Sequence, residues 1–124
     1  MYKNTYILNS TRTTSIIISI YTRVAMVCTD IKIVTTSYGN ENSWSFGNCA
    51  SGQVYENNQI YTEECCQEEG DYQLVCKDSY GDGWSGGFLE INGDTYCEEF
   101  TQGHEKVEEV TMSGTPCSYF VIMI

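Results

Sequence analysis

From Asp30 onward, apolar and polar residues alternate in short runs, the pattern of β-strands that bury one face. In the clearest run, 71–77, Leu74 and Cys76 fall on the same face, opposite Lys77. Further strands are expected at 30–36, 43–46, 88–91, 94–97, 106–112 and 119–124, with a hairpin joining 53–55 to 59–61. Asn92-Gly93 suits the tight turn of a second hairpin.

About eight short strands at regular spacing predict an all-β protein, a two-sheet antiparallel β-sandwich. The composition agrees, because ten tyrosines and many β-branched residues favour strands. The chain has only two alanines and three leucines, so residues that strongly favour helices are scarce. A chain of 124 residues is long enough for one such core.

The first 27 residues differ from the rest, because they contain no glycine, proline or cysteine and carry only basic charges. We divide the chain into an extended basic arm, 1–27, and a β-sandwich domain, 28–124. The segments Ile16–Val27 and Tyr119–Ile124 are apolar and strand-like. Either they complete their own sandwich, or one of them pairs with a neighbouring copy to give a homo-oligomer or homopolymer.

Seven cysteines in so short a chain predict a disulfide-stapled protein of an oxidising compartment, extracellular or on the cell surface. No Cys-x-x-Cys pair supports a zinc site. We expect Cys76 to pair with Cys97, and Cys49 to pair with Cys65 or Cys66. The odd number leaves one cysteine free or linked to another chain.

Charge is distributed unevenly along the chain. Residues 1–28 carry three basic and no acidic residues, whereas 29–124 carry three basic and all 17 acidic residues. A body this acidic repels phosphate backbones, so nucleic acid is excluded as a partner, whereas cations are favoured. No run reaches the roughly 20 apolar residues that a membrane-spanning helix needs.

The segment Asp78–Gly87, Asp-Ser-Tyr-Gly-Asp-Gly-Trp-Ser-Gly-Gly, carries the most chemical information. Its two aspartates lie four residues apart among glycines, so the loop can curl around a cation such as calcium, which takes about six to eight oxygen ligands. Trp84 would anchor the loop in the core. The alternative is a glycine-rich turn whose aspartates accept backbone amides.

A second motif precedes this loop. A strand ends in Thr35-Thr36-Ser37-Tyr38, and Glu41 and Ser43-Trp44 follow. Its Ser-Tyr-Gly is repeated at 79–81, which suggests two similar loops at one end of the sandwich.

Together the two motifs resemble a secreted module of surface and adhesive proteins from microbial eukaryotes and bacteria, over about two-thirds of the chain. The resemblance implies a β-sandwich with a calcium loop, in which Asp78, Asp82 and Glu41 are ligands. Asp30, where the resemblance begins, is a further candidate ligand. The Cys-Cys pair that often follows Asp-Gly in such modules is replaced here by Trp84-Ser85, so the usual disulfide pattern of that loop is not expected.

These features predict an extracellular calcium-stabilised structural or adhesive module, part of a fibrous or surface assembly formed by strand exchange. The alternative is a calcium-dependent carbohydrate-binding module in which tyrosines and Trp84 stack on sugars. No nucleophile or phosphate-loop motif points to an enzyme, and His104, the only histidine, is expected in a solvated turn. Asn9-Ser10-Thr11 is a candidate glycosylation site.

Overall fold

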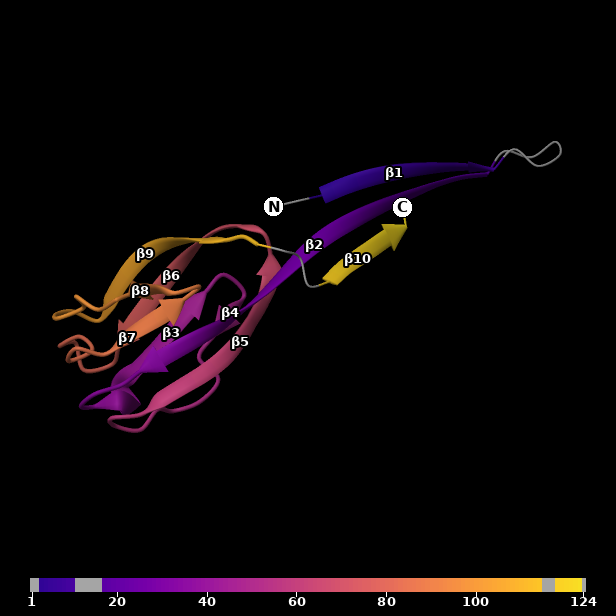
Figure 1. Cartoon of the computed structure of the whole chain (residues 1–124). Coiled ribbons are helices and arrows are strands. Elements are labelled where there is room, and N and C mark those ends of the chain that lie inside the picture. Colours follow the sequence, from indigo (N-terminus) through magenta and orange to yellow (C-terminus); the bar gives the residue numbers. More distant parts are fainter. Residues whose placement is uncertain (1–2, 11–16, 115–117, 124) are drawn as a thin grey trace.

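Two antiparallel sheets packed face to face form the body of the protein, which confirms the predicted all-β sandwich (Figure 1). The computed structural model describes the backbone of residues 3–10, 17–114 and 118–123, and the side chains of residues 26–114. One sheet contains six strands: β1 (Lys3–Ser10), β2 (Ile17–Val34), β5 (Ile60–Glu68), β7 (Phe88–Ile91), β8 (Asp94–Tyr96) and β10 (Ser118–Met123). The other contains four: β3 (Asn42–Phe46), β4 (Cys49–Ala50), β6 (Gly70–Asp78) and β9 (Glu105–Met112).

The core lies between the sheets and follows the two-residue period of the strands. From β6, Leu74, Cys76 and Asp78 point inward, as do Ile31 and Ile33 from β2 in the opposite sheet. The rest of the buried apolar set comes from both sheets and the loops: Val27, Trp44, Phe46, Tyr55, Cys65, Trp84, Leu89, Ile91, Cys97, Phe100, Val110 and Met112. Asp78 is thus a carboxylate at a core position.

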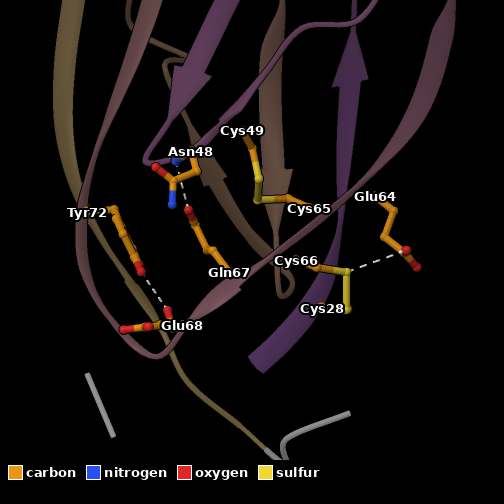
Figure 2. Close-up of a disulfide and its surroundings, with 9 residues drawn as sticks. All are labelled: Cys28, Asn48, Cys49, Glu64, Cys65, Cys66, Gln67, Glu68 and Tyr72. Carbon is orange, nitrogen blue, oxygen red and sulfur yellow. Dashed lines mark hydrogen bonds between the residues drawn. A yellow bond between two sulfur atoms is a disulfide. The ribbon is translucent and has the colours of Figure 1, made fainter. Parts of the chain in front are cut away.

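Three disulfides staple this sandwich. Cys76 pairs with Cys97, as predicted, and Cys49 pairs with Cys65. Because successive residues of a strand point to opposite faces, Cys65 turns into the core while Cys66 turns outward and bonds to Cys28 in the adjacent strand (Figure 2). The vicinal pair therefore forms one link between the sheets and one link within a sheet.

The long strand β2 joins the arm to the body. Its first part pairs with β1 and β10, and its second part, from Met26, pairs with β5 and β7. The three strands β1, β2 and β10 project from the body as a ribbon (Figure 1). The expected boundary between residues 27 and 28 thus falls inside one continuous strand, and the last strand of the chain joins the arm.

The predicted hairpin at 53–55 and 59–61 is wrong, because 53–55 forms no strand. Tyr55 instead turns into the core, where its hydroxyl accepts a hydrogen bond from Trp44 Nε1 at 2.9 Å and donates one to Glu63. The carbonyls of Glu56 and Gln59 accept hydrogen bonds from the side chain and backbone of Thr35, so this segment pairs irregularly with the end of β2. Buried side-chain partners outweigh local strand propensity here.

Replacing both Cys49 and Cys65 by alanine is expected to lower the free energy of unfolding by about 3 kcal/mol, because the link spans a separation of 16 residues and constrains the unfolded chain. Urea denaturation of the double variant beside the parent protein measures the loss. Peptide mapping of the unreduced parent is the control, and a link from Cys49 to Cys66 would contradict the inward orientation of Cys65.

Candidate metal centre

Two loops meet at one end of the sandwich, as the repeated Ser-Tyr-Gly predicted. One loop follows β2 and contains a short 3₁₀ helix, η1 (Gly39–Glu41), and the other follows β6. The backbone amide of Ser79 donates to the carbonyl of Glu41 at 3.0 Å. The hydroxyl of Thr36 donates to the carbonyl of Ser85 at 2.7 Å. The first bond extends the pairing of β3 with β6 in the smaller sheet, and the second ties the residues after β2 to the second loop.

Asp78 organises the second loop. Its Oδ2 accepts three backbone hydrogen bonds, from the amides of Gly81, Asp82 and Gly83, at 2.8, 2.6 and 2.9 Å. The turn expected as the alternative to a cation site is therefore present. It uses only one of the two oxygens, however. The side chain is 1 % exposed, and Oδ1 is buried without a hydrogen-bond partner among the described residues.

Two further carboxylates lie close to Asp78. One carboxylate oxygen from each of Glu41, Asp78 and Asp82 lies within 4.8 Å of the other two. At such distances like charges repel strongly unless a proton or a cation lies between them. The structure thus brings together three of the four predicted ligands.

The pKa values of the three carboxyl groups reflect this repulsion. Desolvation and, after it, the charges of Asp78 and Asp82 raise the pKa of Glu41. Desolvation and the adjacent Asp78 also raise the pKa of Asp82. For Asp78, burial alone would raise the pKa, but hydrogen bonds from the amides of Asp82, Gly81 and Gly83 outweigh it and lower the pKa. The neighbouring carboxylates therefore raise the pKa values of Glu41 and Asp82, whereas the loop amides keep the pKa of Asp78 low.

Backbone and aromatic contacts fix the loop behind this cluster. Trp84 is 1 % exposed, its Nε1 donates to the carbonyl of Lys77 at 2.8 Å, and its amide donates to the carbonyl of Phe100 at 2.9 Å. Gly83 has a φ of +80°, and a Cβ there would collide with the Phe100 carbonyl. The predicted anchoring by Trp84 is confirmed, and its burial contradicts the prediction that Trp84 stacks on sugars.

His104 also supports the loop, which its sequence position did not reveal. Its Nδ1 lies 3.0 Å from the carbonyl oxygen of Asp78, and its own carbonyl accepts the Asp78 amide at 2.8 Å. A Cβ at Gly81 would lie 2.8 Å from the imidazole Nε2. The ring therefore covers the turn, although it is exposed on its other side.

Two other predicted sites lie away from this cluster. Asp30 is exposed in the middle of β2, opposite Glu64, where it lines a separate polar hollow of about 450 Å³. Asn9 lies in β1 opposite Ile18, and its side chain is outside the described residues. A second group of metal-ligating types, around Cys28 and Cys66, is already used by their disulfide.

The chemistry of the cluster fits calcium. All three side chains offer carboxylate oxygens, the hard ligands that calcium prefers, and the cluster contains no thiolate or imidazole that would favour zinc. A cation there would also give Asp78 Oδ1 the partner that it lacks. Glu41, Asp78 and Asp82 are the residues that would hold the ion.

Comparisons with known proteins leave the family open: no family model matches the chain, and no curated protein or solved structure is significantly similar to it. In the part of the chain that the structure describes, no helix is long and apolar enough to cross a membrane.

Glu41→Gln is expected to raise the melting temperature of the calcium-free protein at about pH 7, because it removes one of three repelling charges. The folded-state pKa of Glu41 lies above its ordinary value of 4.5. Between those two values the folded protein binds more protons than the unfolded chain, so the parent gains stability from this group as the pH falls. The benefit of Glu41→Gln should therefore disappear below about pH 4.5.

Thermal melts in EDTA across this pH range measure the effect. Glu109→Gln, on the exposed face of β9, is the matched control and should leave the melting temperature nearly unchanged. A lower melting temperature for Glu41→Gln at neutral pH would contradict the repulsion.

Proposed function

We propose that this chain is an extracellular, non-enzymatic structural module that calcium stabilises. The observation that carries the proposal is the buried, unpartnered Oδ1 of Asp78 beside two further carboxylates. An unpaired buried oxygen costs about 1–3 kcal/mol, and more when it is charged. A bound divalent cation would remove that cost and the repulsion together.

Calcium would act here as a clasp between the two loops. Glu41 lies in the loop between β2 and β3, Asp78 is the last residue of β6, and Asp82 lies in the loop that follows β6. A ligand that binds only the folded loops stabilises the fold by mass action. Calcium sites of extracellular modules commonly have Kd values of about 10⁻⁴–10⁻³ M. Three protein carboxylates are enough ligands for an affinity in this range.

An oxidising location supports the same function. Three disulfides in one small domain are typical of proteins outside the cytosol. Within the described residues, the only cluster of acidic side chains close enough to share a metal ion is the one at the loop tips.

Calcium at about one hundred times its Kd is expected to add about 2.7 kcal/mol to the free energy of unfolding. For a domain of this size, that corresponds to a rise of roughly 10 °C in melting temperature relative to EDTA. Differential scanning calorimetry in calcium and in EDTA measures it. An unchanged melting temperature would contradict the proposal.

Asp78→Asn is the sharpest variant for this experiment. The amide oxygen of asparagine can accept the same three backbone hydrogen bonds, so the loop should still form, but neutral bonds are weaker and the calcium-free melting temperature should fall somewhat. The lost charge should remove most of the calcium-induced rise. Glu109→Gln again serves as the control and should keep the full rise.

We propose that copies of this chain assemble through the ribbon of β1, β2 and β10. Among the described strands, β1 and β10 each pair only with β2, so each presents one free edge. Free edges of this kind add strands from other chains. The basic residues of 1–28 would also favour contact with the acidic body of a second copy.

A proline scan of β1 in the full chain tests this assembly. Adjacent residues of a strand direct their amides to opposite edges, so of Thr5→Pro and Tyr6→Pro one removes a hydrogen bond to β2 and the other blocks the free edge. Analytical ultracentrifugation should show an oligomer for the parent and its loss for the edge-blocking variant. A monomeric parent at high protein concentration would contradict assembly through the arm.

A further inference from the structure

A hollow of about 260 Å³ opens beside the carboxylate cluster. Four residues line it: Tyr38 and Glu41 from the first loop, and Tyr80 and Asp82 from the second. Two of them belong to the candidate metal centre, so a cation held there would face this hollow. The two tyrosines are 59 % and 74 % exposed, and large aromatic side chains in such positions are commonly binding surfaces.

The repeated Ser-Tyr-Gly accounts for the placement of the tyrosines. In each loop the tyrosine immediately precedes the glycine, and the loops lie side by side, so both tyrosines border the same opening. Tyr38 adopts a left-handed φ of 58°, which is unusual for a residue with a side chain. Its carbonyl accepts the Glu41 amide at 3.0 Å, and the next amide donates to Asn57, so the conformation is held in place.

Three carboxylates leave a bound calcium short of its usual six to eight or so oxygens. The protein face of the cluster is closed: Asp78 is 1 % exposed and its Oδ2 is taken by amides. The remaining ligands must therefore come from the open side, where the hollow lies. That is where water or a ligand with oxygen atoms would complete the shell.

Charge selects the kind of ligand. Three carboxylates around one divalent cation leave a net negative charge, in a body that carries 17 acidic residues. A fourth carboxylate or a phosphate would be repelled, whereas neutral hydroxyls would not. A pair of hydroxyls on adjacent ring carbons supplies two oxygens at once, and the C–H face of the same ring can pack on an aromatic side chain.

Resting on the proposed calcium site, we propose that this hollow binds a neutral sugar through two neighbouring hydroxyls on the calcium, with the ring packed against Tyr38 or Tyr80. The volume of about 260 Å³ is below the roughly 300–1,000 Å³ of drug-sized pockets, so one terminal sugar unit fits it better than an extended chain. A ligand this small and this exposed is expected to bind with a Kd on the order of 1 mM.

The test uses the full chain and the methyl glycosides of mannose, glucose, galactose and fucose, which present cis and trans hydroxyl pairs. Saturation-transfer NMR and calorimetric titration in calcium should detect at least one of them, and EDTA should abolish the signal. Tyr80→Ala or Tyr38→Ala should weaken binding about tenfold or more, whereas Tyr80→Phe keeps the ring and should retain it. All three variants should keep the calcium-induced rise in melting temperature.

The possible failures separate the two proposals. If calcium raises the melting temperature but no glycoside binds, the sugar site is wrong and the calcium-stabilised module stands. If calcium has no effect on melting, both are wrong. Binding that survives EDTA, or that favours glucuronate over the neutral sugars, would overturn recognition through the metal.

Discussion

The buried carboxylate of Asp78 is the constraint on which this end of the molecule depends. Its core position follows from the two-residue period of β6, and burial of a charge there requires hydrogen bonds on both oxygens. The loop backbone donates three hydrogen bonds to Oδ2 and none to Oδ1, and two further carboxylates lie close by. The turn that the sequence allowed is therefore present and accounts for the first oxygen, whereas the second is the reason for proposing a cation.

Strand alternation predicted much of the fold because it is a local property. It located most of the strands of the body and the inward positions of Leu74 and Cys76. The Cys76–Cys97 link was predicted correctly, although it joins the two sheets and does not lie between paired strands. Strand alternation left the partner of Cys49 open, because the direction in which Cys65 and Cys66 point depends on the register of β5 against β2. The register is set by contacts between segments that are far apart in the sequence. A short stretch of sequence therefore does not reveal it.

The same distinction explains what the sequence missed at the site. The repeated Ser-Tyr-Gly predicted two neighbouring loops, because each follows a strand that runs to the same end. The support from His104 depends on a contact across 26 residues, with no pattern in the sequence to mark it. Asp30 was placed with the ligands by proximity to the motif, but it points outward from the middle of β2. Asp30 lies within β2, whereas the two loops meet beyond the ends of their strands. Only residues near those ends can join the cluster.

The ribbon and the loop tips occupy opposite ends of one strand. β2 has 18 residues, so at about 3.3 Å each it spans roughly 60 Å from the arm to the loop that carries Glu41. The Cys28–Cys66 link fixes β2 to β5 between these two ends (Figure 2). Interactions separated by such a distance and sharing no partner are expected to be energetically independent. The proposed assembly through the ribbon and the proposed ligand binding at the tips would therefore not compete for the same surface of one copy.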